Sequence, residues 1–101
     1  MTVNELRKKL KGLGIEIPLH TLRRRIDRYV ELPTRGQRNN YRDLTNEEVN
    51  RMLVAVSIET LGKSSDEVVD YVDGRIDKVK LLGDVVNSSK VAVFLKSWIL
   101  G

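Results

Sequence analysis

Residues 18–42 read PLHTLRRRIDRYVELPTRGQRNNYR, and this basic stretch gives the strongest indication of the fold. Its first half, residues 18–30, repeats apolar side chains at the spacing of one helical face. These residues are Leu19, Leu22, Ile26, Tyr29 and Val30. Pro18 suits the first turn of this helix, because its missing N–H would have no partner there. The opposite face of the helical wheel is cationic: it carries His20, Arg24 and Arg28, with Arg23 and Arg25 at its flanks.

The polar stretch that follows this helix is predicted to form a hairpin. Pro33 ends the helix, and residues 34–40 contain no apolar side chain. Extended segments at 31–34 and 40–43 are expected to pair as a short two-stranded wing. The stretch also carries Arg35, Arg38 and Arg42. A cationic helix followed by a cationic hairpin suits duplex DNA, because the helix can enter a groove while the hairpin contacts neighbouring phosphates.

Charge is distributed unevenly along the chain. Residues 1–42 contain 11 of the 18 lysines and arginines but only four of the 14 carboxylates. Residues 43–101 reverse this balance, and the net charge of the whole chain is +4. A basic half of this kind attracts a polyanion, so the expected partner is double-stranded DNA and the expected contact surface lies before residue 43.

Composition argues against several other classes of protein. There is no cysteine and a single histidine, so disulfides are excluded and no metal site or cofactor is expected. No nucleophile–base pair or glycine-rich phosphate loop is present, so an enzyme is not expected. The longest apolar run, residues 91–95, is too short to cross a bilayer, and the start of the chain lacks the apolar run of a secretory signal. The expected location is therefore the cytoplasm, in association with the nucleoid, without a membrane partner.

Capping-box spacings predict where three further helices begin. The pairs are Thr2 with Glu5, Thr45 with Glu48, and Ser64 with Glu67. Gly12 and Gly62 are expected to end the first and third of the four N-terminal helices. The fourth helix is expected to continue along one apolar face as far as Leu82 and to end at Gly83, although Gly74 weakens this continuity by about 1 kcal/mol relative to alanine.

The tail of the chain, residues 88–100, fits either a helix or a strand, and its spacing favours the helix. Its apolar residues suggest an oligomerisation surface, because an apolar terminal helix is often covered by a second copy. The residues concerned are Val91, Phe94, Leu95 and Trp98. The alternative is that part of this surface packs into the core of its own chain.

Several short motifs follow one another along residues 21–68. They are Thr21-Leu22-Arg23, Glu31-Leu32-Pro33, Asn40-Tyr41-Arg42, Thr45-Asn46-Glu47-Glu48-Val49 and Leu61-Gly62-Lys63-Ser64-Ser65-Asp66-Glu67-Val68. Through these motifs, residues 3–72 resemble the MerR-type winged-helix family. The family pattern is a short helix, a helix that opens with Thr-Leu-Arg, a wing that ends in Gly-Tyr-Arg, and two further capped helices.

The sequence departs from the family pattern at several positions. Arg24 and Arg25 replace aromatic residues, Asn40 stands in place of the wing glycine, and Leu44 replaces a common tyrosine. The long antiparallel dimerisation helix and the effector-binding region of many relatives are also missing. The resemblance therefore implies DNA contact but no small-molecule effector.

The fold implied by the resemblance is mainly α: a winged helix-turn-helix with a short two-stranded wing and a C-terminal helical appendage. Residues 1–73 would form the DNA-binding domain. Residues 74–101 would form a helical segment for core packing or oligomerisation. The implied function is sequence-specific binding of double-stranded DNA, most simply in transcriptional regulation. An excisionase-like, architectural or segregation-type DNA-binding role is the alternative within the same fold, and a protein-interaction module that uses the apolar tail is the alternative from another class.

Individual residues receive roles from this resemblance and from their side-chain chemistry. Arg23 matches the family arginine that clamps a phosphate, a role that suits its planar fork of donors. Arg24 and Arg28 are the best candidates for contact with base edges. Tyr41 and Arg42 match the end of the wing. The full set of expected DNA-binding residues is His20, Thr21, Arg23, Arg24, Arg25, Arg28, Arg35, Arg38, Asn40, Tyr41 and Arg42.

Overall fold

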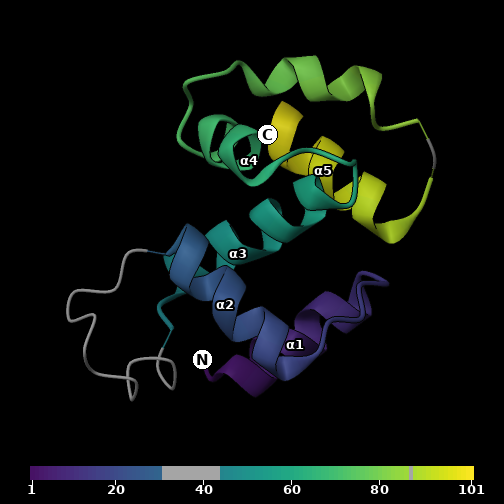
Figure 1. Cartoon of the computed structure of the whole chain (residues 1–101). Coiled ribbons are helices and arrows are strands. Elements are labelled where there is room, and N and C mark those ends of the chain that lie inside the picture. Colours follow the sequence, from purple (N-terminus) through teal and green to yellow (C-terminus); the bar gives the residue numbers. More distant parts are fainter. Residues whose placement is uncertain (31–43, 87) are drawn as a thin grey trace. The chain divides into compact units, whose positions relative to one another are not determined.

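The computed structural model describes residues 1–30, 44–86 and 88–101, and these residues form six helices and no strand (Figure 1). The helices are α1 (Val3–Gly12), α2 (Leu19–Tyr29), α3 (Asn46–Glu59), α4 (Ser65–Val72), the 3-10 helix η2 (Lys78–Gly83) and α5 (Lys90–Leu100). The described part is therefore all-α, as expected. The wing predicted at 31–34 and 40–43 lies outside the described residues.

Two compact units divide the chain, Met1–Leu53 and Val54–Gly101, and the division falls within α3. In the first unit α1 packs against α2. Three side chains of α1 and three of α2 are buried, and those of α2 are among the residues that the apolar spacing predicted: Val3, Leu6 and Leu10 with Leu22, Ile26 and Tyr29. Each large apolar side chain removed from water in this way contributes about 1.5–3 kcal/mol to folding.

Capping interactions begin α1 and α3 at the predicted residues. The Thr2 side chain accepts a hydrogen bond from the Glu5 backbone N–H at 3.2 Å. At the start of α3 both halves of the box form. The Thr45 N–H donates to Glu48 Oε1 at 2.8 Å, and the Glu48 N–H donates to Thr45 Oγ1 at 3.1 Å. These bonds satisfy backbone donors that the first turn of a helix leaves unpaired.

The second unit also begins its helices with capping interactions, and two lysines form contacts within it. The capping box of Ser64 and Glu67 opens α4 as predicted, and η2 packs against α5. Lys78 joins these last two elements: its Nζ donates to the Trp98 carbonyl at 2.9 Å and lies 4.9 Å from the centre of the indole ring. Lys63 pairs with Asp84 at 3.1 Å, and the hydrogen bond to this carboxylate raises the pKa of Lys63 above its ordinary value of 10.5.

The prediction that the fourth helix continues to Leu82 is wrong. α4 ends at Val72, and Gly74 adopts the left-handed backbone with φ +79°. The N–H of Arg75 then donates to the Asp70 carbonyl at 2.8 Å, which closes the turn. Asp77 begins η2 by accepting from the Val79 N–H at 3.0 Å, and Val79, expected on the buried face, is 51% exposed. Glycine permits this break because it has no Cβ to oppose a positive φ.

Replacing Gly74 with alanine should change the stability of the protein in opposite directions, depending on whether this residue lies in a turn or in a continuous helix. In the observed turn the alanine Cβ opposes the positive φ, so Gly74→Ala should destabilise the protein by about 1–2 kcal/mol. In a continuous helix the same change would stabilise by about 1 kcal/mol. Gly83→Ala is the matched control, because an added Cβ meets nothing within 4 Å there and φ is ordinary. Urea unfolding of the two variants measures the difference.

The tail helix is confirmed, since α5 spans Lys90–Leu100 and Ser89 caps it by accepting from the Ala92 N–H at 3.2 Å. Its buried residues are Ala92, Leu95 and Ile99. None of the helices in the described part of the chain has both the length and the apolar character needed to cross a bilayer.

Candidate nucleic-acid interface

The outward face of α2 carries the helical residues that were expected to contact DNA. The side chains of His20, Arg23, Arg24 and Arg28 are exposed, while Thr21 and Arg25 are half-buried. Leu22 and Ile26 are completely buried on the opposite face. The helix is therefore amphipathic in the predicted sense, with its apolar side against the core and its arginines directed to solvent.

The charges on this face are available to an outside anion. Among residues 1–30, 44–86 and 88–101, no ion pair involves Arg23, Arg24 or Arg28. α2 holds four arginines against a single carboxylate, Asp27. Exposed guanidinium groups of this kind suit phosphate oxygens and the acceptor edge of guanine, because their donors form a planar fork.

Arg51 fixes the end of α2, a role that was not predicted from the sequence. This half-buried side chain extends from α3 within the first unit, and its Nε donates to the carbonyl of Tyr29, the last residue of α2. The last carbonyls of a helix have no hydrogen-bond partner inside the helix and carry partial negative charge. A cationic side chain there donates the missing hydrogen bond and is attracted by that charge. α2 is thus held at its C-terminal end by a charged hydrogen bond.

Removing this contact should loosen α2. Arg51→Ala is expected to lower the free energy of unfolding by about 1–2 kcal/mol, because it removes a charge-assisted hydrogen bond at a helix end. Urea unfolding followed by circular dichroism measures the change. The neighbouring Asn50 is exposed, so Asn50→Ala should not destabilise the protein. Equal losses in the two variants would contradict the role of Arg51.

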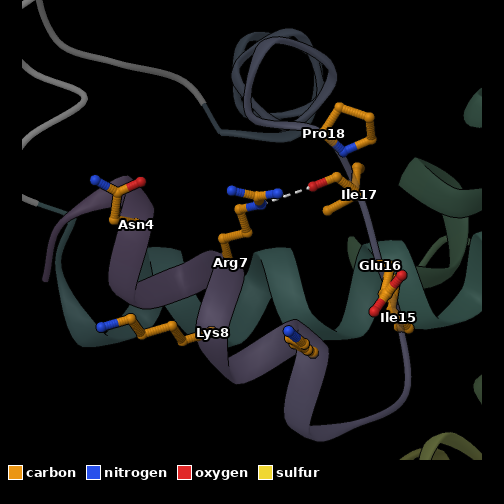
Figure 2. Close-up of a pocket in the computed structure, with 8 residues that line it drawn as sticks. Asn4, Arg7, Lys8, Ile15, Glu16, Ile17 and Pro18 are labelled. Atoms are coloured by element: carbon orange, nitrogen blue, oxygen red, sulfur yellow. Dashed lines mark hydrogen bonds between the residues drawn. The ribbon is translucent and has the colours of Figure 1, made fainter.

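A second long-range contact holds the turn between α1 and α2. Arg7 Nε donates to the Ile17 carbonyl at 3.1 Å (Figure 2). Gly14 turns the chain between the two helices with φ +87°. Beside this contact lies an open hollow of about 710 Å³. It is lined by Asn4, Arg7, Lys8, Lys11, Ile15, Glu16, Ile17 and Pro18. None of these residues was among the expected DNA contacts, although the basic composition of residues 7–11 was visible in the sequence.

The expected wing contacts, Arg35, Arg38, Asn40, Tyr41 and Arg42, lie outside the described residues. The described chain stops at Val30 and resumes at Leu44, both of which are buried. Leu44 is anchored to Met1 by two backbone hydrogen bonds: its N–H donates to the Met1 carbonyl at 2.8 Å, and its carbonyl accepts from the Met1 amino group at 2.9 Å. Both ends of the predicted wing segment are therefore attached to the same unit as α2.

The four tail residues that were considered for oligomerisation differ in how far they are buried. Leu95 is completely buried within its own chain. Val91, Phe94 and Trp98 are half-buried, and Val93 and Leu100 are the more exposed apolar residues of α5 at 60% and 73%. Part of the tail thus belongs to the core of the second unit, which was the alternative that the sequence left open.

Comparison of the chain with protein-family models, curated proteins and solved structures finds no match. No group of three or more histidine, aspartate or glutamate side chains is placed to hold a metal ion in the described part of the chain. The candidate interface thus consists of one helix, α2, with a buried apolar face and an exposed arginine face.

Proposed function

We propose that this chain binds double-stranded DNA with sequence specificity and acts as a transcriptional regulator. α2 would enter the major groove as the recognition helix of a MerR-like winged helix-turn-helix, with α1 as the preceding helix. The basic segment between Val30 and Leu44 would lie on the flanking backbone or in the minor groove. One observation carries the proposal: Arg23, Arg24 and Arg28 are exposed on one helix, and no carboxylate in the described residues neutralises them.

Two features of the first unit support a docking role for α2. The helix is held at both ends, by the contact of Arg7 with the α1–α2 turn and by the contact of Arg51 with its last carbonyl. Its buried face fixes the rotation of the helix about its axis, so the arginines project in a defined direction. A rigid element loses little conformational freedom on binding, and base readout requires side chains at fixed positions.

Selection of bound fragments from random duplex DNA, followed by fluorescence anisotropy with the selected sequence, tests the proposal. Arg23, Arg35, Arg38 and Arg42 would each neutralise one phosphate, and each neutralised phosphate contributes about −0.9 to the salt dependence. A plot of the logarithm of the binding constant against the logarithm of the salt concentration should therefore have a slope of about −3 to −4. Absence of any enriched sequence, together with a flat salt dependence, would rule out specific DNA binding.

A protein-interaction module is the second candidate, and one observation favours it. α5 exposes Val93 and Leu100 and leaves Trp98 half-buried. Exposed apolar side chains on one helix are suited to a protein partner or to a second copy of this chain. Its binding would be insensitive to salt, whereas binding of DNA through arginines would not be.

A further inference from the structure

The hollow beside the α1–α2 turn has the composition of an anion site. Three of its lining side chains, Arg7, Lys8 and Lys11, are cationic, and Glu16 is the only carboxylate among them. In the described residues no ion pair involves any of these three cations. Several uncompensated cations that line one concave surface concentrate positive potential there.

Arg7 is held in position for such a ligand. Figure 2 shows its side chain extending from α1 toward the carbonyl of Ile17, to which Nε donates at 3.1 Å. That bond uses one of the five N–H donors of the guanidinium, and the remaining four are on the terminal nitrogens. An arginine whose orientation is fixed in this way loses less conformational freedom when it binds an anion.

The hollow also adjoins the start of α2. Pro18, which lines it, is the residue that precedes the helix. No side chain caps α2 at this end, and its first turn contains no acidic residue. Backbone N–H groups at an uncapped helix start attract anions, and phosphate is one of the anions found at such sites. The cationic hollow and the uncapped helix start therefore favour the same class of ligand.

We propose that this hollow binds a backbone phosphate of the same duplex that α2 binds, through Arg7, Lys8 and Lys11. The inference rests on the proposed function and extends its contact surface from α2 to α1. Arg7 also holds the α1–α2 turn, whereas Lys8 and Lys11 are exposed and form no ion pair within the described residues, and the proposal gives these two lysines a function. These contacts would hold the protein in register on the duplex without reading bases.

α1 supplies a matched set of variants for the test. Lys8, Lys9 and Lys11 are all exposed lysines of one helix, but only Lys8 and Lys11 line the hollow. Lys8→Ala and Lys11→Ala should each reduce the salt slope of DNA binding, and the double variant should lower it by about 0.9, because one neutralised phosphate is lost; Lys9→Ala should leave it nearly unchanged. Ethylation interference should reveal a backbone phosphate whose modification weakens the wild type but not the Lys8→Ala, Lys11→Ala double variant.

The outcomes separate this inference from the proposed function. Equal slopes for all three lysine variants, in a protein that still selects a DNA sequence, would overturn the phosphate site alone. A wild type that binds no duplex would overturn both proposals. If inorganic phosphate or ATP raises the melting temperature of the wild type but not of the double variant, while the DNA salt slope is the same in both, the hollow binds a soluble phosphate compound and the duplex assignment is wrong.

Discussion

Arg24→Ala should weaken binding to the selected DNA sequence by about 1–3 kcal/mol, a roughly 5- to 150-fold loss, because an arginine that reads a base cannot be replaced by a neighbouring phosphate contact. Arg24 is exposed on the outward face of α2, and no carboxylate in the described residues pairs with it. Binding to random duplex should change much less. Anisotropy titrations with the selected duplex and with a scrambled duplex measure both values.

Arg23→Ala is the control within the same helix. Arg23 is exposed like Arg24, but the resemblance to the MerR-type family implies that it clamps a phosphate. Its removal should weaken the selected and the scrambled duplex by the same factor, and should reduce the salt slope by about 0.9. If Arg23→Ala and Arg24→Ala cause equal losses on both sequences, Arg24 does not read a base.

Leu95→Ala should lower the free energy of unfolding by about 2–5 kcal/mol, because truncation of a buried leucine removes apolar contacts and leaves a cavity. Leu95 is completely buried within the second unit of its own chain. A loss of this size is a large fraction of the stability of a small domain. Urea unfolding monitored by the fluorescence of Trp98, the only tryptophan, measures it.

Val93→Ala is the matched control for this change, because Val93 lies on the same helix and is 60% exposed. It should alter stability by less than about 0.5 kcal/mol. Light scattering of both variants separates core packing from association. A Leu95→Ala protein that keeps its stability but changes from a dimer to a monomer would show that this leucine serves an interface between copies.

Helix beginnings were predictable from sequence because they depend on bonds between residues three apart. Thr45 with Glu48, and Ser64 with Glu67, form the expected boxes without any contribution from distant segments. The amphipathic pattern of α2 was predictable for a similar reason, since one buried face determines which side chains remain outside. Arg24 and Arg28 are accordingly exposed as expected.

The break after α4 was not predicted, although its signals were present in the sequence. Val72, Ile76 and Val79 follow the helical period, and this spacing favoured a continuous helix. The capping competence of Asp77 and the positive φ open to Gly74 decided the outcome instead. Periodicity identifies the residues that share a face only where the backbone remains helical. A glycine followed three residues later by a capping side chain indicates a helix break more strongly than apolar spacing indicates a continuous helix.

The contacts that hold α2 were beyond sequence reasoning. The hydrogen bonds from Arg7 to Ile17 and from Arg51 to Tyr29 span 10 and 22 positions. Such pairs depend on how helices pack, and a basic side chain alone gives no indication of its acceptor. The hollow lined by Lys8 and Lys11 was missed for the same reason, because it exists only where α1 meets the turn that precedes α2.

Titration of isotopically labelled protein with the selected duplex, followed by amide chemical shifts, tests most directly whether α2 is the DNA-binding element. The largest shift changes should fall on α2 between His20 and Arg28, with smaller changes on α1 around Lys8 and Lys11, which line the proposed phosphate site. Changes confined to α5, or an α2 whose signals do not respond to saturating DNA, would contradict DNA recognition by this helix.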